Sequence, residues 1–181
     1  MKRLRRICLV VFLVMAGVIL GVWGYGSTLS AEKDLVVNAT FTATPIQPLF
    51  ALLTDFSKTP TWKSTTIRIE ELPEVSGHPV WREYTSDTDH IDLMIVEQMP
   101  PTRLVMQIAN ANEVGFTGKW TYTLKPIQAG TAVTIHEQSQ IPDPIMRAVY
   151  TLMTDPSQTI QTELTDLGST LNDPPIIEFV D

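Results

Sequence analysis

The sequence predicts an α+β fold in which a curved antiparallel sheet of seven strands wraps around a long C-terminal helix, behind an N-terminal transmembrane helix. Three observations lead to this prediction. Residues 7–25 contain no charged side chain. Residues 34–140 contain apolar side chains at every second position, in runs that are separated by turn residues. Residues 146–171 place apolar side chains at helical spacing, which predicts one long helix able to cover a sheet.

The N-terminal segment has the composition of a membrane anchor. "MKRLRR" places four positive charges before "ICLVVFLVMAGVILGVWGY", residues 7–25. At ~1.5 Å per residue this run spans roughly 28 Å, the thickness of a bilayer core. A cleaved signal sequence is the alternative, but its apolar core is shorter, about 7–15 residues, and usually precedes a small-x-small site. Leu29 lies two positions before Ala31, so "GSTLSAEK" provides no such site. This favours an uncleaved anchor.

The charge asymmetry predicts the topology of the chain. A basic N-terminus stays in the cytoplasm, so the remainder is expected on the outer, periplasmic or extracellular, side of the cytoplasmic membrane. Trp23 and Tyr25 then lie at the level of an interfacial aromatic belt. The domain prediction is a basic stub, anchor and tether over 1–30, a globular domain over 31–172, and a tail over 173–181.

Small residues in the anchor leave two alternatives open. Gly17 and Gly21 form a G-x-x-x-G step that permits close approach of two anchors and hence a weak dimer, whereas glycines that simply face lipid are the more common meaning of this pattern.

Cys8 is the only cysteine, so the sequence excludes an intrachain disulfide and a cysteine-ligated metal site. An inert membrane thiol is a simpler interpretation of Cys8 than an acylation site.

The globular part is strongly acidic. The whole chain has a formal net charge of −7 and the first thirty residues carry +4, so the remainder carries −11. A domain with this charge lacks the basic surface that binds phosphate backbones. The sequence therefore predicts no nucleic-acid partner.

Residues 34–140 are expected to fold as strand, short helices and six further strands. "DLVVNATFTA" alternates in the manner of a half-buried strand. "TPIQPLFALLTDF" then has helical spacing, with Thr44 as N-cap and Pro45 at the first helical position. Further short helical structure is expected before Trp62, which is expected to begin the second strand. The next six strands are predicted from the runs "TTIRIEEL", "PVWREYTS", "HIDLMIVEQM", "TRLVMQIAN", "GFTGKWTYTLKP" and "TAVTIHEQSQI". Their hairpin-length connections imply antiparallel pairing.

The C-terminal helical pattern is interrupted once. In "TDPSQ", Asp155 is a plausible cap and Pro156 suits a first helical turn, so a kink or two abutting helices are expected there. The tail "NDPPIIEFVD" contains too much proline to continue the helix.

Three stretches together resemble one known superfamily. They are "PIQPLFALLTDFSKTPTW", "EQMPPTRLVMQI" and "GKWTYTLKPIQAGTAVTIHEQ". On them the chain resembles the START-like, Bet v 1-like (SRPBCC) superfamily, in particular its polyketide cyclase/dehydrase and lipid-transport group, over about residues 34–171. The resemblance implies a helix-grip fold with two short helices between strands one and two, and an internal cavity for lipids, polyketides or other apolar molecules. It supplies no universal catalytic set, and the anchor departs from the usual soluble member.

No motif for a cofactor, a metal ion or a covalent nucleophile is present in the sequence. The chain lacks G-x-S-x-G, metal-spaced His/Cys clusters and phosphate-binding glycine loops, so neither a cofactor nor a metal is predicted. His78 and His90 fall beside turns and His136 has the parity of the solvated face, so solvent-exposed histidines are expected.

Two glutamates are the candidate acid/base residues. Glu97 has the parity of Ile95 and Glu137 that of Ile135, so regular strands would direct both carboxylates inward. Burial disfavours the charged form, raises the pKa of a carboxyl and suits it to proton transfer or to a ligand hydroxyl. The simpler alternative is that each lies at a strand end, beyond a bulge, and reaches water.

The residues predicted to line the cavity share inward parity or helical spacing, although core packing explains such residues at least as often. They are Trp62, Leu93, Ile95, Met106, Ile108, Trp120, Tyr122, Ile135, Met146 and Tyr150. The segment "LTDFSKTPTW", residues 53–62, is expected to form the rim and lid. The first functional hypothesis is a non-catalytic, membrane-anchored binder of a lipid or other small apolar ligand. The alternative is a cyclase- or dehydratase-like enzyme that uses Glu97 or Glu137, and a third is a collapsed cavity whose domain only contacts proteins.

Overall fold

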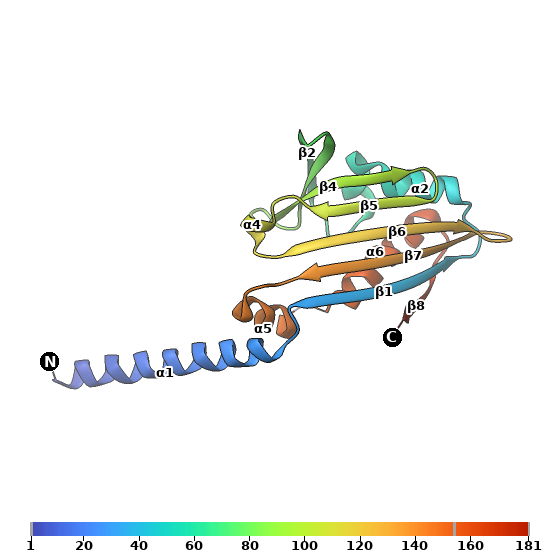
Figure 1. Cartoon of the computed structure of the whole chain (residues 1–181). Coiled ribbons are helices and arrows are strands. Elements are labelled where there is room, and N and C mark those ends of the chain that lie inside the picture. Colours follow the sequence, from blue (N-terminus) through green and yellow to red (C-terminus); the bar gives the residue numbers. More distant parts are fainter. Residues whose placement is uncertain (1, 154, 181) are drawn as a thin grey trace. The chain divides into compact units, whose positions relative to one another are not determined.

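The computed structural model describes residues 2–153 and 155–180, which form two compact units. One unit contains residues 2–32 and 141–153, and the other contains residues 33–140 and 155–180. The larger one contains the sheet and one long helix (Figure 1).

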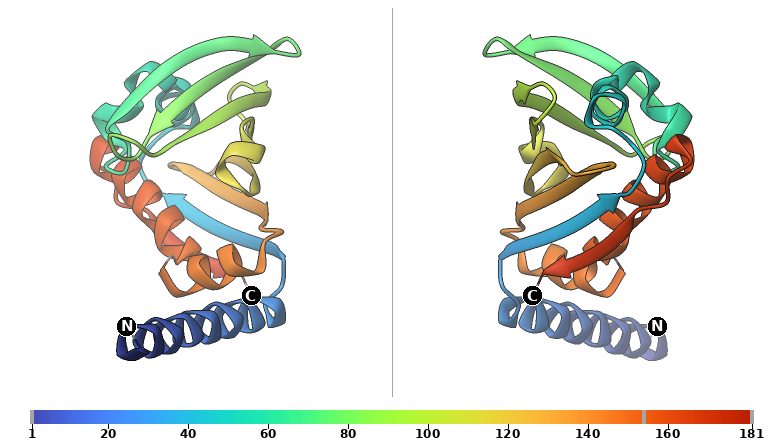
Figure 2. Two further views of the ribbon diagram at one scale, coloured as in Figure 1. Left: turned by 90° about the vertical axis from the view of Figure 1, so that its left-hand side faces the viewer. Right: turned by 90° about the vertical axis from the view of Figure 1, so that its right-hand side faces the viewer.

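The larger unit is built on an eight-stranded antiparallel sheet, in the order β2-β3-β4-β5-β6-β7-β1-β8. The strands are β1 (Glu32–Phe41), β2 (Arg68–Val75), β3 (His78–Tyr84), β4 (His90–Met99), β5 (Arg103–Ile108), β6 (Thr117–Pro126), β7 (Thr131–Gln140) and β8 (Ile176–Val180). The six consecutive strands β2–β7 are those expected from the alternating runs. The sheet bends around α6 (Pro156–Leu171), as Figure 2 shows.

The prediction of seven strands was wrong because the tail adds an eighth. Pro174 and Pro175 end the helical region, but Ile176–Val180 pairs antiparallel with β1, from Thr40↔Ile176 to Val36↔Val180. These residues are β-branched or aromatic, a composition that favours strands. The tail therefore belongs to the sheet.

Short helices connect β1 to β2, as expected. They are α2 (Ile46–Thr54), the 3₁₀ turn η1 (Phe56–Lys58) and α3 (Thr59–Trp62). Trp62 ends α3 and does not begin a strand. Pro45, and not Thr44, occupies the N-cap position of α2. The Thr44 hydroxyl does not cap the helix and instead donates to the Asp173 carboxylate at 2.8 Å. A further short helix, α4 (Ala111–Val114), follows β5.

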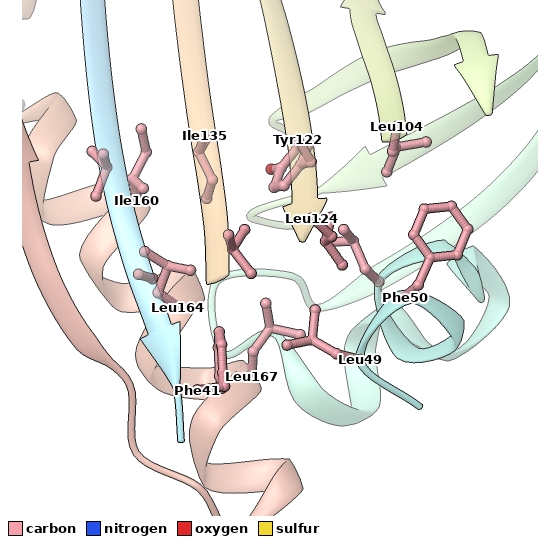
Figure 3. Close-up of a cluster of buried hydrophobic side chains, with 14 of the residues drawn as sticks. Phe41, Leu49, Phe50, Leu104, Tyr122, Leu124, Ile135, Ile160, Leu164 and Leu167 are labelled. Carbon is pink, nitrogen blue, oxygen red and sulfur yellow. The ribbon is translucent and has the colours of Figure 1, made fainter. Parts of the chain in front are cut away.

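The core lies between α2, α6 and the inner face of the sheet (Figure 3). Ile160, Leu164 and Leu167 of α6 are at most 4% exposed and contact inward side chains of the strands. Phe41 and Leu49 close the cluster at the α2 end. Asp155 caps α6 as predicted, since its carboxylate accepts a hydrogen bond from the Ser157 N–H at 3.0 Å.

The smaller unit contains two helices, α1 (Lys2–Thr28) and α5 (Pro144–Met153). Within α1, residues 5–28 are long and apolar enough to cross a membrane and are exposed, a composition shared by anchors and signal sequences. The interruption expected at residues 154–158 separates two helices, α5 and α6, as one of the two alternatives predicted. The two helices belong to different units, and α6 alone is the long helix against the sheet.

Candidate functional site

A polar cluster lies on the inner face of the sheet, at the end where β4 begins and β5 ends. It consists of Lys63, Glu83, Tyr122 and Glu163, contributed by the residue after α3, by β3, by β6 and by α6. Glu83 shares the inward parity of Trp81, and their cross-strand partners on β4 are Ile91 and Leu93. The fold thus brings four chain-distant polar side chains to one place.

Lys63 bridges the two carboxylates of this cluster. Its Nζ lies 2.9 Å from Glu83 Oε1 and 3.2 Å from Glu163 Oε2. The other oxygen of Glu163, Oε1, accepts a hydrogen bond from the Tyr122 hydroxyl at 2.6 Å. Glu83 also accepts a hydrogen bond from the Thr66 hydroxyl. The result is a continuous chain of charge-assisted hydrogen bonds from Thr66 to Tyr122.

Burial and charge set the protonation of Lys63 and Tyr122. Burial alone would lower the pKa of Lys63, but the carboxylates of Glu163 and Glu83 outweigh it and raise that pKa above its ordinary value. Burial first, and the negative charge of Glu163 next, raise the pKa of Tyr122 well above its ordinary value of about 10. At neutral pH the cluster therefore holds an ammonium and a neutral phenol.

Glu137 is a third inward carboxyl in this region. It is 7% exposed and lies opposite Trp120 in the β6–β7 register. Burial raises the pKa of Glu137, a hydrogen bond with the Trp120 side chain lowers it, and the negative charge of Glu163 raises it further, with a net rise. The inward direction predicted for Glu137 is what the structure shows.

Two small spaces adjoin the Lys63 cluster. The larger has a volume of about 110 Å³ and is lined partly by Ile91, Trp120 and Ile160. The smaller, about 20 Å³, is lined partly by Phe56 and Trp62. Both spaces are also lined by the same five side chains, Lys63, Glu83, Leu93, Met106 and Glu163. Lys63, Glu83 and Glu163 of the cluster therefore form a wall that both spaces share, and we call the two spaces together the inner pocket.

The inner pocket contains a buried donor that lacks a protein acceptor. The indole Nε1–H of Trp62 makes no hydrogen bond to any of the described residues, although Trp62 is 7% exposed. An unmade hydrogen bond of this kind costs about 1–3 kcal/mol.

A larger hollow lies at the opposite end of the strands. Its volume is about 490 Å³, and it is formed by the loops around Pro45–Gln47, Pro101–Thr102 and Pro126–Gly130. No ionisable side chain lines it. The hollow therefore lacks the charged side chains that line the inner pocket. Across residues 2–153 and 155–180, no group of three or more His, Cys, Asp or Glu side chains is placed to hold a metal ion.

The predicted lining residues fall into three groups. Those on the wall of the inner pocket are Trp62, Leu93, Met106, Trp120 and Tyr122. Ile95, Ile108 and Ile135 are buried but are absent from the lining of either space. Met146, which is 42% exposed, and Tyr150 lie on α5 in the smaller unit, and neither lines either space.

The predicted inward direction of Glu97 is changed by a β-bulge. The register shifts between Ile95 and Glu97, so that Ile95 pairs with Met106 but Glu97 pairs with Val105. Because side chains alternate along a strand, the extra residue moves Glu97 to the opposite face from Ile95. There its carboxylate accepts a hydrogen bond from Arg103 Nε at 2.9 Å. The alternative interpretation of Glu97, beyond a bulge and reaching water, describes it correctly.

The histidines lie outside the inner pocket. His78 Nδ1 is 3.1 Å from the Ile95 carbonyl oxygen, His90 Nε2 is 3.3 Å from Glu113, and His136 Nε2 is 2.7 Å from Asp34. None of the three lines either space.

Sequence reasoning missed Lys63, Glu83 and Glu163. The sequence pattern could have predicted an inward direction for two of them. Glu83 has the strand parity of Trp81, and Glu163 lies three residues after Ile160 and one before Leu164, within the apolar stripe of α6. Lys63 follows Trp62 in a non-repetitive segment, where no periodicity indicates direction.

Replacing each candidate glutamate with glutamine tests the contrast between them. We expect Glu137→Gln to raise the midpoint of thermal unfolding at pH 7 and to leave it unchanged at pH 4. When folding raises the pKa of a carboxyl, the protein loses stability as pH rises from the unfolded-state pKa, about 4.3, towards the folded-state pKa. Glutamine does not ionise and therefore removes that loss. Glu97→Gln is the matched control, with no such pH-dependent gain. Equal effects at both pH values would contradict the burial of Glu137.

Comparison with known proteins places the chain in a family. The family described as "Polyketide cyclase / dehydrase and lipid transport" matches residues 34–167. The chain belongs to this family. No curated protein sequence matches it. The match covers the whole sheet except β8, together with most of α6.

Solved structures confirm the fold of the family. The di-domain ARO/CYC StfQ from the steffimycin biosynthetic pathway is similar with a TM-score of 0.58 and 14% identity, over 75% of this chain and 50% of that one. Norcoclaurine synthase from Thalictrum flavum, in complex with dopamine and hydroxybenzaldehyde, gives a TM-score of 0.60 and 7% identity, over 78% and 87% of the two chains. Ara h 8.0201 is similar with a TM-score of 0.54 and 14% identity, over 78% of this chain and 99% of that one. This chain thus spans half the length of StfQ, and the likeness concerns the fold alone.

Proposed function

We propose that this chain is a membrane-anchored binding protein whose inner pocket takes a small, mostly apolar molecule with a hydrogen-bond donor. One observation carries the proposal: two carboxylates, Glu83 and Glu163, line the pocket with a single ammonium, that of Lys63. Their sum is one negative charge beside apolar walls. Such a pocket favours a hydroxyl or an amine and disfavours an anion.

The size of the pocket narrows the ligand class. About 110 Å³ is well below the roughly 300–1,000 Å³ of sites for drug-sized ligands. It is comparable to an engineered cavity of about 150 Å³ that accepts benzene. A long-chain lipid therefore does not fit the pocket in this conformation. A molecule with one ring, or the end of a longer one, does.

The rim of the pocket is held at one end. Ser64 donates two hydrogen bonds to Asp166 of α6, both at 2.7 Å, and Lys63 beside it contacts Glu163 of the same helix. Admission of a larger ligand would therefore move Phe56 and the start of α3 more readily than residues 63–66. This supports a lid formed by residues 53–62.

The proposal predicts an order of affinities among matched ligands. For the full chain in detergent or nanodiscs, we expect 2-phenylethylamine and 2-phenylethanol to bind at least tenfold more tightly than phenylacetate at pH 7. Tenfold corresponds to about 1.4 kcal/mol, a modest cost for placing an anion beside an excess negative charge. Isothermal titration calorimetry measures the three constants. Glu163→Gln removes the excess charge and should shrink the difference, while Glu97→Gln on the opposite face should leave it unchanged. Tighter binding of the carboxylate would contradict the proposal.

The anchor and its orientation belong to the same proposal. The four basic residues before the apolar run favour a cytoplasmic N-terminus and a domain on the outer side. In a bacterial host, protease added to spheroplasts should then degrade the domain while cytoplasmic proteins survive. A domain protected until the membrane is broken would reverse the assigned orientation, and a domain released in soluble form would show that α1 is a cleaved signal.

An acid/base enzyme is the second candidate, and a specific observation favours it. Tyr122 and Lys63 contact different oxygens of Glu163, at 2.6 and 3.2 Å, so a proton donor and a cation converge beside an apolar space. The Tyr122 hydroxyl or the Lys63 ammonium can polarise a carbonyl oxygen, while the Glu163 carboxylate accepts the proton α to that carbonyl and returns a proton from solvent. The test is deuterium exchange of a small aryl ketone such as phenylacetone in D₂O, followed by NMR. Exchange accelerated by the full chain and lost in Tyr122→Phe would support catalysis; no acceleration leaves the binder as the function.

A further inference from the structure

The smaller unit presents an apolar stripe that the inner pocket does not explain. It lies on α5, whose exposed large apolar residues recur at helical spacing. They are Ile145, Met146, Val149, Leu152 and Met153. The last two are 70% and 82% exposed. A stripe of this kind costs free energy if it remains in water.

α5 is packed against the C-terminal end of α1. A Cβ atom at Gly26 would lie 1.7 Å from the Pro144 carbonyl oxygen, so only glycine permits this approach. Arg147 Nη1 donates to the Leu29 carbonyl oxygen at 2.8 Å, and the Ile141 N–H donates to the Ala31 carbonyl oxygen at 2.9 Å. Both contacts hold α5 just beyond the apolar run.

The position along α1 identifies the level of this contact. Trp23 and Tyr25, 52% and 45% exposed, lie within one turn of Gly26. Exposed aromatic residues at the end of a spanning helix lie at the boundary between acyl chains and head groups. The N-terminal end of α5 therefore contacts α1 at this boundary.

We infer that α5 is a second membrane contact, an amphipathic helix that lies in the interface and inserts its apolar stripe among the lipids. Its occupant is the lipid surface that receives α1, and the inference therefore rests on the proposed anchor. The ten residues of α5 cover roughly 15 Å of interface. Arg147 is the only charged residue in α5, so insertion relies on apolar area.

The electrostatics of the rest of the chain explain the need for such a contact. Beyond residue 30 the chain carries a net charge of −11, and anionic head groups repel it. A short tether alone would leave the acidic domain to move away from the bilayer. The α5 stripe supplies attraction that is independent of charge and is not screened by salt.

The experiment uses the full chain in vesicles of phosphatidylcholine and phosphatidylglycerol. With Cys8→Ser as background, single cysteines are introduced as Leu152→Cys, Thr151→Cys and Ile19→Cys and labelled with an environment-sensitive fluorophore. Leu152 and Thr151 are adjacent and exposed but lie on different faces of α5. We expect a blue-shifted emission at residue 152, quenched several-fold more strongly by nitroxide-labelled lipids than the emission at residue 151.

The outcomes separate the inference from the anchor on which it rests. Quenching at residue 19 without quenching at residue 152 overturns the inference and leaves the anchor intact. A blue shift at residue 152 without lipid quenching also overturns it, because the stripe would then be covered by protein. Absence of quenching at residue 19 overturns the anchor itself. Gly26→Val is a second variant: it should displace α5 from α1 and reduce quenching at residue 152 while preserving it at residue 19.

Discussion

Replacing Lys63 with methionine is expected to destabilise the protein by about 2–4 kcal/mol at pH 7. The substitution leaves Glu83 and Glu163 facing each other without the ammonium between them, and their side chains are only 6% and 12% exposed. Removing one partner of a buried ion pair costs about 3–5 kcal/mol, and partial access to the pocket reduces that figure.

The contribution of Lys63 to stability depends on pH at high pH. Its folded-state pKa lies above the unfolded value of about 10.4, so its contribution is complete below that value and is lost as pH rises through the folded pKa. Near-UV circular dichroism during urea unfolding of the full chain in detergent measures these differences. Lys58→Met is the matched control: Lys58 pairs with Asp55 at the surface, where its side chain is 67% exposed, and should change stability little. A Lys63→Met variant as stable as the control would show that the cluster is solvated and not a buried network.

Asp173→Ala is expected to lower stability by about 2–4 kcal/mol, or roughly 5–15 °C in the midpoint of thermal unfolding. The Asp173 carboxylate accepts five hydrogen bonds, from the backbone N–H groups of Thr42, Ala43 and Thr44 and from the hydroxyls of Thr42 and Thr44. These bonds, at 2.8–3.3 Å, connect the second residue after α6 to the turn between β1 and α2. Alanine would leave buried donors without an acceptor.

The pH dependence of this variant follows from the hydrogen bonds. Burial alone would raise the pKa of Asp173, but the bonds from Ala43, Thr44 and Thr42 outweigh it and lower that pKa. A lowered pKa contributes stability above the unfolded value, about 3.9, and that stability is lost as pH falls through the folded value. The difference in the free energy of unfolding between the natural chain and the variant should therefore be largest at pH 7 and should decrease below about pH 4. Asp173→Asn should lie between the two, and exposed Glu178→Ala should have no measurable effect. A pH-independent gap would contradict the role assigned to the charge.

Periodicity predicted most of the sheet because strands such as β1 and β7 have one buried face. Val37, Ala39 and Phe41 on β1 and Val133 and Ile135 on β7 are at most 2% exposed, which is what strict alternation implies. Alternation fails where the backbone departs from regular pairing. The bulge after Ile95 inserts one residue, and no residue type in "IVEQ" indicates it. Regular alternation therefore places Glu97 on the wrong face, and only the alternative of a bulge describes it, whereas alternation places Glu137, on a strand with unbroken register, on the correct face.

The candidate site was only half predictable for a related reason. Part of its apolar wall follows from parity, which directs Met106 and Trp120 inward, whereas Trp62 was expected to begin a strand and instead ends α3. Its polar cluster depends on contacts between residues far apart in the chain, such as Lys63 with Glu163, which no local pattern encodes. The position of α5 was missed because helical spacing identifies an apolar stripe but not the surface that the stripe meets.

The pairing of β8 with β1 makes a five-residue strand, and not the ten-residue β1, the outer strand at one margin of the sheet. An uncovered strand offers a row of free amide and carbonyl groups to any extended peptide, including the same strand of another molecule. A protein shortened after residue 172, or one whose tail is displaced by a fused tag, would therefore expose the edge of β1, which could pair with β1 of a second molecule and cause aggregation. Preparations intended for crystallisation or ligand screening should keep residues 176–180 intact and carry any tag on a flexible spacer.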